Sequence, residues 1–449
     1  MGHKLFGTDG IRGIANSYPL NAEFMLKIAK LLAQTVCTEK KKVAIGKDTR
    51  NSGDMIEAAL TAGFTACGID VYSLGIVPTP LVTLKTKDLR VDMSIMITAS
   101  HNPYQDNGIK LIDKNGDKFS DEFYEKIEKL LNKEVNENFI PTKTGKIIHK
   151  EEVVEEYIEY IRNIAPNYKA FQNLRIVLDC ANGAYSYILP QAFKDLGAGV
   201  IAINNKPDGF NINKDCGTQH PEALAQTVLA THANFGIAVD GDGDRILLVD
   251  DKGQIIDGDQ LLCFLAHFLK TNNLLNDNIV VATEWSNLGL AEYMKNNGFN
   301  YYKSKVGERY VIELMKEKKA SLGGEVVGHI VVADFAKTGD ALVCAFVLSM
   351  AYILDGRKMS DIFPIFTPYP CIIENIRFST AEYMRESIEY PEVKEALIDG
   401  KKQLGVNSTL IARKSGTEPV IKLRVESPDE RKVKQVAEMI KQLILNHQK

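Results

Sequence analysis

The sequence lacks an apolar run long enough to span a bilayer. Its longest apolar stretch runs from Ala341 to Leu354, whereas a membrane-spanning helix needs about 20 residues. The first ten residues, MGHKLFGTDG, contain no apolar core of the kind that secretory signal peptides carry. We therefore expect no membrane segment and no secretion signal, and we expect Ala341 to Leu354 to form a buried helix.

The sequence also lacks a large excess of charge of one sign and a pair of closely spaced cysteines. The 54 Lys and Arg residues nearly balance the 58 Asp and Glu residues, so the net charge is −4, and both kinds are interspersed along the chain. No basic stripe or tail points to a nucleic-acid or membrane partner. The seven cysteines are scattered without a C-x-x-C pair, which is typical of reduced thiols in the cytoplasm.

What the sequence does contain is a repeated α/β pattern. Three stretches each combine a short β-branched run, a polar turn, a helix-like segment rich in Ala and Leu, a Gly and a second apolar run. Strands that alternate with helices predict parallel α/β sheets. The expected helices are Asp54 to Cys67, Ser186 to Leu196 and Leu288 to Asn296. The turns before them, where such sheets bind ligands, are Asp48 to Ser52, Asp179 to Gly183 and Ser286 to Gly289.

The end of the chain follows another plan. Pro364 to Pro370 is a Pro-rich break typical of linkers, and beyond it the pattern predicts strand, helix, strand, strand and helix. In PVIKLRVES, apolar and charged residues alternate, which indicates a strand with one buried face. Further helices are expected over Glu151 to Ile164 and Asp429 to Leu445. We expect three similar mixed α/β domains in tandem and a smaller α+β domain, spanning residues 1–152, 153–254, 255–366 and 367–449.

The most specific motif is DGDGDR, from Asp240 to Arg245, which lies between two apolar runs. Alternation with Gly in a turn lets the side chains of Asp240, Asp242 and Asp244 point at one centre. Oxygen-only ligands favour a hard cation such as Mg²⁺. A calcium loop of the EF-hand type also begins D-x-D-x-D, but it needs Gly at its sixth position, where this chain has Arg245. We therefore expect a magnesium-binding turn between two strands.

Two further motifs suit phosphate chemistry. TASHNP, from Thr98 to Pro103, follows a buried-looking run and is expected to expose Ser100 at a strand end. A serine hydroxyl is a poor nucleophile unaided, but a nearby Mg²⁺ would orient its oxygen and neutralise an attached phosphate. RKSGTEP, from Arg413 to Pro419, joins two strands with cationic, hydroxyl and Gly residues. These are groups that hold a phosphate dianion.

Together with FGTDGIRG at Phe6 to Gly13, these segments occur in the order typical of the α-D-phosphohexomutase superfamily, which the chain resembles over nearly its whole length. Within it, NINKDCGTQHPE, KVGERYV and RKSGTEP are most similar to the members that interconvert glucosamine 6-phosphate and glucosamine 1-phosphate. The resemblance implies four domains arranged around a central cleft. It also implies an isomerase that supplies the synthesis of UDP-N-acetylglucosamine.

The resemblance further implies a role for each motif residue. Ser100 would be the phosphoserine and would hold one Mg²⁺ together with Asp240, Asp242 and Asp244. The transfer site would be lined by Arg12, His101, Lys110 and Arg245. The substrate would be bound by Glu325, His329, Arg413, Ser415, Gly416 and Thr417. Phospho-Ser100 would donate its phosphoryl group to the sugar, and the bisphosphate so formed would turn over and return its other phosphate. An activating kinase or a sugar bisphosphate would prime the serine of a monomer or homodimer.

Two departures from the family pattern fall in the third repeat. Where the family usually reads Gly-Glu-x-Ser-Gly-His, this chain has Val327 in place of Ser, and valine cannot donate a hydrogen bond. Glu284 and Trp285, the only Trp, stand where small or aliphatic residues are expected. The same reaction on glucose or mannose phosphates, as in phosphoglucomutases and phosphomannomutases, is therefore the main alternative. A metal-dependent phosphatase and a non-catalytic sugar-phosphate sensor are further ones.

Overall fold

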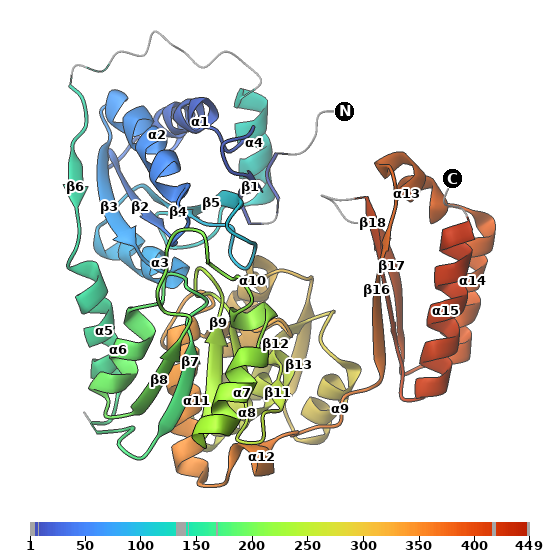
Figure 1. Ribbon diagram of the computed structural model, residues 1–449. Coiled ribbons are helices and arrows are strands. Elements are labelled where there is room, and N and C mark those ends of the chain that lie inside the picture. The colour runs from blue at the N-terminus through green and yellow to red at the C-terminus, as the bar shows by residue number, and fades with distance from the viewer. Residues whose placement is uncertain are drawn as a thin grey trace. The chain divides into compact units, whose positions relative to one another are not determined.

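The chain folds into two compact units, whose elements are labelled in Figure 1. The computed structural model describes residues 5–7, 9–131, 141, 143–167, 169–414 and 419–446. The first unit comprises the chain up to Glu284 together with Asn300–Pro364, and the second comprises Trp285–Phe299 with the chain from Ile365 onward. Within the described residues, no helix combines the length and the apolar character that crossing a bilayer requires.

The first α/β domain is built on a six-stranded sheet in the order β1-β5-β4-β2-β3-β6. Strands β4, β2, β3 and β6 are parallel, whereas β5 is antiparallel to both β4 and β1. The strands are β1 Ile11–Ile14, β2 Lys42–Lys47, β3 Asp70–Ile76, β4 Met93–Ile97, β5 Asp106–Asp113 and β6 Ile147–His149. The helices are α1 Ala22–Thr35, α2 Gly53–Ala66, α3 Thr79–Asp88 and α4 Asp121–Leu131. The apolar stripes of α1, α2 and α4 share one core with β2 and β4, and α1 and α2 lie side by side (Figure 1).

The second α/β domain has a five-stranded sheet in the order β11-β10-β9-β7-β8. Strand β7 is parallel to β8 and β9, and β9 and β10 form an antiparallel hairpin. The strands are β7 Arg175–Asp179, β8 Gly199–Ile203, β9 Phe235–Val239, β10 Ile246–Val249 and β11 Ile255–Ile256. The helices are α5 Val153–Ile164, α6 Ile188–Asp195 and α7 Glu222–Thr231, with a 3₁₀ turn at Gly217–Gln219. The acidic motif is the turn of the β9–β10 hairpin, between two strands as predicted.

The third α/β domain has a four-stranded sheet in the order β13-β12-β14-β15. Strand β12 is parallel to β13 and β14, whereas β14 and β15 are antiparallel. The strands are β12 Ile279–Thr283, β13 Asn300–Ser304, β14 Leu322–Gly324 and β15 Ile330–Val332. The helices are α8 Gly258–Thr271, α10 Glu308–Lys318, α11 Ala341–Asp355 and α12 Met359–Ile362, with a 3₁₀ turn at Asn276–Asn278. The predicted buried helix is α11, which is buried from Ala341 to Ser349.

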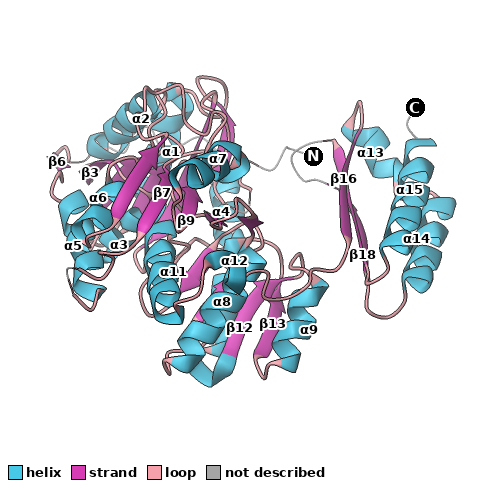
Figure 2. Cartoon of the chain, turned by 60° about the horizontal axis from the view of Figure 1, so that its bottom comes forward, coloured by secondary structure: helices cyan, strands magenta, loops and turns pink. Residues whose placement is uncertain are grey.

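The second unit is an antiparallel sheet, β16-β18-β17, with helices α14 and α15 on one side (Figure 2). Its strands are β16 Cys371–Arg377, β17 Thr409–Lys414 and β18 Val420–Glu426, and its helices are α9 Leu288–Asn296, α13 Ala381–Ser387, α14 Pro391–Leu404 and α15 Glu430–Asn446. The apolar residues of β18 pack in a core with α15, which confirms the predicted alternation. The pattern predicted one helix after the first strand, but two are present, because Pro391 begins a new helix.

Three α/β domains followed by a small α+β domain confirm the predicted fold class. The three predicted repeat helices are α2, α6 and α9, with ends shifted by at most two residues. The sheets are mixed, however, and not purely parallel as the repeats suggested. Each α/β domain has an antiparallel hairpin at its predicted motif, namely β4–β5, β9–β10 or β14–β15, and the second domain has a further one, β10–β11. Antiparallel hairpins need only a short turn, and the turns of β4–β5, β9–β10 and β14–β15 contain the motifs that the sequence singled out.

Candidate active site

Ser100 lies in the turn of the β4–β5 hairpin and faces the acidic turn of the second domain. Its Oγ donates a hydrogen bond to Asp240 Oδ2 at 2.6 Å and lies 3.4 Å from His101 Nδ1. The residue is only 1% exposed, which corrects the expectation of an exposed serine. The sequence could not show the hydrogen bond to Asp240, because the two residues are 140 positions apart.

The Ser100 turn is held by a buried arginine that sequence reasoning missed. Ser100 has φ of 54°, a region that residues other than Gly seldom occupy. The guanidinium of Arg50, 2% exposed, donates to the side chain of Asp48 (2.9 Å). It also donates to the carbonyl oxygens of Ser100 (2.9 Å), Asn102 (2.8 Å), Asp106 (3.0 Å) and Pro103. One side chain from the first repeat turn therefore bonds four carbonyl oxygens of the Ser100 turn and helps to fix its backbone.

A second support comes from the neighbouring domain. Asn213 Nδ2 donates to the carbonyl oxygens of Ser100 (2.8 Å) and Asn102 (3.0 Å). Within the turn, Thr98 Oγ1 accepts from Ser100 N at 2.8 Å and donates to Asp48 Oδ2 at 2.7 Å. Asn213 belongs to the NINKDCGTQHPE stretch, for which the sequence indicates a family resemblance but no contact. Its sequence position gives no sign of this contact.

The acidic turn gathers three carboxylates in a buried space. Asp240, Asp242 and Asp244 are at most 1% exposed, and one oxygen of each lies within 4.8 Å of the others. Gly243 has φ of 74°, and a Cβ there would lie 2.2 Å from the Tyr185 ring, so only Gly fits at this point of the turn. A Cβ at Gly183, in the second repeat turn, would lie 2.4 Å from the carbonyl oxygen of Gly241. The turn is thus shaped to bring the three carboxylates together.

The donor set of this turn fits a hard divalent cation. Among the described side chains, Asp242 Oδ1 is buried and has no hydrogen-bond partner, and such an oxygen is costly unless something binds it. Burial, with repulsion from Asp244 and Asp242, raises the pKa of Asp240 to about 7. A bound cation would favour the ionised carboxylates. Oxygen donors of this kind suit Mg²⁺.

Basic side chains surround the carboxylates. Lys110 Nζ lies 2.6 Å from an oxygen of Asp242 and 2.6 Å from one of Asp244. Arg245 Nε lies 4.0 Å from Asp244 Oδ1, and the backbone N–H of Arg245 donates to Asp240 Oδ1 at 3.2 Å. Burial lowers the pKa of His101 to about 3, and Arg245 and Arg12 contribute to this, so His101 is neutral at physiological pH.

Arg12 and Lys110 are joined through an acidic residue of the opening motif that sequence reasoning did not use. Asp9 Oδ2 lies 3.3 Å from both Arg12 and Lys110, and Asp9 Oδ1 lies 2.7 Å from Lys118 Nζ. Burial opposes ionisation of Asp9, but Lys110, Lys118 and Arg12 outweigh it and hold its pKa well below the ordinary value. Asp9 lies within FGTDGIRG, so this motif could have identified it as a candidate site residue. The predicted residues Arg12, His101, Lys110 and Arg245 thus converge on Ser100 and the acidic turn.

The third hairpin turn brings Glu325 and His329 to the same place. His329 Nε2 lies 2.9 Å from Asp244 Oδ1, and its Nδ1 lies 3.0 Å from Glu325 Oε2. Burial opposes protonation, but Asp244 raises the pKa of His329 to about 10. Both side chains are buried, whereas Val327 at the tip of the turn is 48% exposed. Val327 is therefore the more accessible side chain of this turn.

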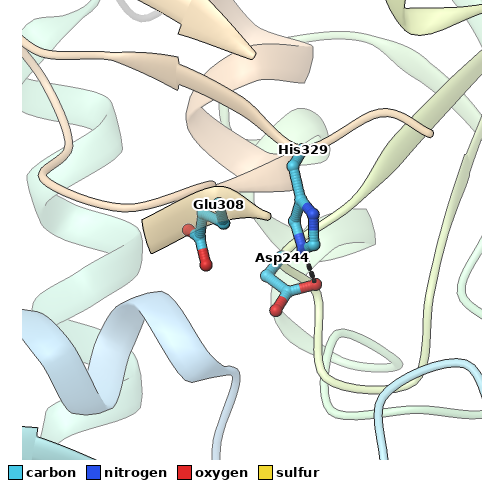
Figure 3. A group of neighbouring side chains, drawn as sticks. All are labelled: Asp244, Glu308 and His329. Carbon is cyan, nitrogen blue, oxygen red and sulfur yellow. Dashed lines mark ion pairs between the residues drawn. The ribbon is translucent and has the colours of Figure 1, made fainter. Parts of the chain in front are cut away.

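Asp244 also belongs to a second group of potential metal ligands, with Glu308 and His329 (Figure 3). In this group both His329 nitrogens face carboxylates. Glu308 Oε2 pairs with Lys118, and its Oε1 accepts from Gly339 N at 2.6 Å and from the Thr338 hydroxyl. Since these ligand atoms are already paired, the group is an ion-pair network that joins the first and third domains.

The predicted phosphate loop belongs to the second unit. Arg413 was expected in the loop, but it is the penultimate residue of β17 and its side chain is exposed. Its Cζ lies 4.8 Å from the centre of the Trp285 ring. The other predicted members, Ser415, Gly416 and Thr417, lie outside the described residues.

Comparisons with known proteins agree with this arrangement. Four models of the phosphoglucomutase/phosphomannomutase family match the chain: alpha/beta/alpha domain I at residues 3–138, domain II at 155–253, domain III at 257–369 and the C-terminal domain at 381–443. The phosphoglucosamine mutase of Agrobacterium fabrum is 41% identical over 440 residues, which cover 97% of either chain.

Solved structures share the fold. A phosphoglucomutase/phosphomannomutase family protein from Burkholderia thailandensis matches with a TM-score of 0.81 at 23% identity, over 100% of this chain and 98% of that one. The N-acetylphosphoglucosamine mutase of Aspergillus fumigatus, in complex with GlcNAc-6P and magnesium, matches with a TM-score of 0.66 at 14% identity, over 100% of this chain and 96% of that one. With all four domains matched and a close relative aligned end to end, the chain belongs to the phosphoglucosamine mutase family of the α-D-phosphohexomutase superfamily and is a mutase.

Proposed function

We propose that the chain interconverts glucosamine 6-phosphate and glucosamine 1-phosphate by phosphoryl transfer through Ser100. The observation that carries the proposal is the 2.6 Å hydrogen bond from Ser100 Oγ to Asp240, one of three buried carboxylates. A nucleophile beside a cation-binding turn suits phosphoryl transfer, where positioning and charge dominate catalysis. The choice of amino sugar rests on the relatives, which are named as phosphoglucosamine mutases.

The cofactor of this proposal is one Mg²⁺ ion, held by Asp240, Asp242, Asp244 and the oxygens of phospho-Ser100. When bound, the ion offsets the negative charge of the phosphate and orients Ser100 Oγ. The related Aspergillus fumigatus enzyme was crystallised with magnesium and a hexosamine phosphate. Lys110, which already lies against Asp242 and Asp244, brings a further positive charge to the oxygens of the moving phosphoryl group.

The reaction consists of two half-reactions. First, a sugar hydroxyl oxygen bonds to the phosphorus of phospho-Ser100 while the bond from phosphorus to Ser100 Oγ breaks, and the serine oxygen takes up the proton that the hydroxyl loses. The resulting sugar bisphosphate then turns over. In the second half-reaction, Ser100 Oγ bonds to the phosphorus of the other phosphate while the bond from that phosphorus to the sugar oxygen breaks, and the sugar oxygen takes up the proton that the serine loses. Arg12, His101 and Arg245 line this transfer site, since their side chains lie 3.3 Å from Asp9 Oδ2, 3.4 Å from Ser100 Oγ and 4.0 Å from Asp244 Oδ1, respectively.

The substrate is held at two further places in this proposal. Arg413, Ser415, Gly416 and Thr417 bind the phosphate that is not being transferred. Glu325 and His329, in the β14–β15 hairpin turn, bind the sugar. The first phosphate on Ser100 comes from a sugar bisphosphate or an activating kinase, and the enzyme acts as a monomer or homodimer. Its product supplies UDP-N-acetylglucosamine synthesis in the cytoplasm, a reducing compartment that fits seven free cysteines.

The central claim is tested by locating phosphate on the purified protein. Intact-mass analysis and peptide mapping, before and after incubation with glucosamine 1,6-bisphosphate, should find one phosphate on Ser100. Ser100→Ala should carry none and lose at least about 10³-fold in kcat, because the covalent route is gone. Ser379→Ala, at an exposed serine of the second unit, is the matched control and should behave as wild type. Wild-type turnover by Ser100→Ala would disprove the proposal.

A second candidate, mutase activity on glucose or mannose phosphates, is favoured by one observation. Val327 is exposed at the tip of the β14–β15 hairpin turn, and its side chain cannot form a hydrogen bond with the sugar. The two candidates are separated by kcat/KM on glucosamine, glucose, mannose and N-acetylglucosamine 1-phosphates, each primed with its bisphosphate. We expect the amino sugar to be preferred, and a preference for glucose or mannose would replace our assignment with the second candidate.

A further inference from the structure

A threonine of the first domain bonds to the acidic turn of the second domain. Thr79 Oγ1 donates a hydrogen bond to Asp242 Oδ2 at 2.5 Å, and Thr79 N donates to the carbonyl oxygen of Asp242 at 2.9 Å. Thr79 is only 2% exposed, although the two residues are 163 positions apart in the chain. One buried residue therefore holds both the side chain and the backbone of a proposed metal ligand.

The residues on either side of Thr79 place it for this contact. Thr79 is the first residue of α3 and stands between Pro78 and Pro80. Proline fixes φ near about −65°, which suits the first turn of a helix. The first N–H groups of a helix have no partner within it, so the N–H of Thr79 is available for the Asp242 carbonyl oxygen.

The contact gives the two carboxylate oxygens of Asp242 different roles. Oδ2 accepts from Thr79 and from Lys110 Nζ, which lies 2.6 Å away. Oδ1 is buried and has no hydrogen-bond partner among the described side chains. Lys110 is shared with Asp244 and, in the proposed function, with the moving phosphoryl group. Thr79 is therefore the donor that remains on Oδ2 and leaves only Oδ1 for a cation.

The number of oxygens that a carboxylate presents affects which cation it prefers. Mg²⁺ requires a nearly octahedral set of ligands at about 2.0–2.1 Å, whereas Ca²⁺ accepts about 6–8 oxygens at longer distances and often takes both oxygens of one carboxylate. A carboxylate that is fixed as a one-oxygen ligand therefore favours Mg²⁺.

We propose that Thr79 is a positioning residue for the cation and makes the acidic turn selective for Mg²⁺ over Ca²⁺. Its hydroxyl holds Asp242 Oδ2, so that Asp242 binds the ion through Oδ1 alone. This inference rests on the proposed function, in which Asp240, Asp242 and Asp244 hold one Mg²⁺. Thr79 acts through Asp242 and touches neither the ion nor the phosphoryl group.

The test is isothermal titration of the full chain with Mg²⁺ and, separately, with Ca²⁺. Thr79→Val keeps a similar side-chain shape without the hydroxyl. It should weaken Mg²⁺ binding about 10- to 100-fold, the usual loss when a hydrogen bond to a metal ligand is removed. Ca²⁺ binding should weaken less than about threefold, because Asp242 can then offer both oxygens to the larger ion. Thr79→Ser, which keeps the hydroxyl, should restore most of the Mg²⁺ affinity.

Thr86→Val is the matched control, because it removes a buried hydroxyl from the same helix. Thr86 is 0% exposed, and its Oγ1 donates to the Val82 carbonyl oxygen at 2.8 Å and to Ser94 Oγ at 2.7 Å. These partners belong to the first domain, so the substitution should leave the affinities for both ions unchanged. Unfolding midpoints of all the variants show whether each is folded.

Electron paramagnetic resonance of bound Mn²⁺ gives a readout that a purely structural role would not change. Mn²⁺ suits the same oxygen ligands as Mg²⁺, and its spectrum reports how regular its coordination is. The Thr79→Val spectrum should be broader than that of wild type, because Asp242 no longer presents a single fixed oxygen. The spectra of Thr79→Ser and Thr86→Val should match wild type.

The outcomes separate the inference from the proposed function. If Thr79→Val binds both ions as wild type does, the inference is wrong and the proposed function stands. If Thr79→Val and Thr86→Val weaken Mg²⁺ binding equally, with equally lowered unfolding midpoints, Thr79 acts only on folding and the inference is again overturned. If wild type binds Mg²⁺ and Thr79→Val does so weakly, but no sugar phosphate is converted, the inference stands and the proposed function fails.

Discussion

At the scale of single residues, the proposed role of Ser100 depends on how its backbone is held. Its backbone lies in the left-handed region, which costs about 1–2 kcal/mol for a residue with a Cβ. The bonds from Arg50 and Asn213 to its carbonyl oxygen offset that cost. Neither supporting residue contacts a reacting atom, so their effect on catalysis is one of position.

We predict that Arg50→Lys lowers kcat about 10- to 100-fold while changing KM less than about twofold. An ammonium group cannot reach the four carbonyl oxygens that the forked guanidinium bonds, so Ser100 Oγ would move away from Asp240. A displacement near 1 Å costs about 10²-fold in rate. Steady-state kinetics and the ³¹P resonance of phospho-Ser100 provide the readouts. Arg357→Lys, at an exposed arginine, is the control, and an unshifted resonance in Arg50→Lys would contradict the prediction.

Asp9 gives a prediction for the dependence of stability on pH. Since Lys110, Lys118 and Arg12 depress its pKa in the folded state, ionised Asp9 stabilises the fold at every pH above the ordinary value of 3.8. That contribution is lost as the pH falls through the depressed value. Asp9→Asn should therefore cost about 2 kcal/mol of unfolding free energy, constant from pH 8 to about pH 4 and shrinking below that.

Urea unfolding of wild type and Asp9→Asn across this range measures the difference. Asp399→Asn, on an exposed face of α14, should cost less than about 1 kcal/mol at each pH, because exposed ion pairs contribute little. A difference for Asp9→Asn that already narrows between pH 8 and pH 5 would show that its folded pKa is not depressed.

At the scale of elements, three hairpin turns form the first unit's site. They follow β4, β9 and β14, and each belongs to a different α/β domain. A turn that must fit tightly against its neighbours tolerates little change. Gly243 shows this most clearly, since a Cβ there would overlap the ring of Tyr185.

We predict that Gly243→Ala destabilises the chain by about 1–3 kcal/mol more than Gly356→Ala. Both glycines have a left-handed backbone, with φ of 74° and 78°, but a Cβ at Gly356 would meet nothing within 4 Å. The difference therefore isolates the overlap with Tyr185 from the backbone strain. Urea unfolding measures the cost, and isothermal titration should show weaker Mg²⁺ binding only for Gly243→Ala. Equal costs for the two variants would contradict the proposed tight fit.

Many of the helices, strands and turns could be predicted from the sequence, because they depend on the pattern of residues close together in the chain. The alternation in β18, the buried α11 and the turn Asp240 to Arg245 all follow from residues close together in the chain. The support of Ser100 could not be predicted, because Arg50 and Asn213 reach it from 50 and 113 positions away. The break between α13 and α14 was missed although Pro391 marked it. Burial of Ser100 was misjudged, because an Asn-Pro turn indicates a loop and says nothing of what covers it.

At the scale of the whole molecule, the two units contain different features whose response can be measured separately. The acidic turn lies in the first unit, and the only tryptophan lies in the second. Unfolding of the second unit can therefore be followed by tryptophan emission, without an attached fluorescent label.

We predict that Mg²⁺ at about 100 times its Kd stabilises the first unit by about 2.7 kcal/mol and leaves the second unit unchanged. Thermal unfolding followed by far-ultraviolet circular dichroism should shift upward with Mg²⁺, whereas unfolding followed by tryptophan emission should not. Removal of the metal with EDTA should reverse the shift and abolish activity. Asp242→Asn should show no shift, and an equal shift of both signals in wild type would indicate one cooperative unit.

The segment Trp285–Phe299 lies in the sequence between two parts of the first unit but belongs to the second. The chain therefore passes from one unit to the other three times, and the C-terminal residues are not a detachable module. A fragment cut at the Pro-rich break would keep Arg424 and Glu426 but lose the backbone groups of Trp285 and Leu288 that they bond. In that fragment the buried ion pair of Arg424 with Glu426 would lose these hydrogen-bond partners. We therefore expect truncations and domain exchanges of this chain to fold only if residues 285–299 and 365–449 are kept together.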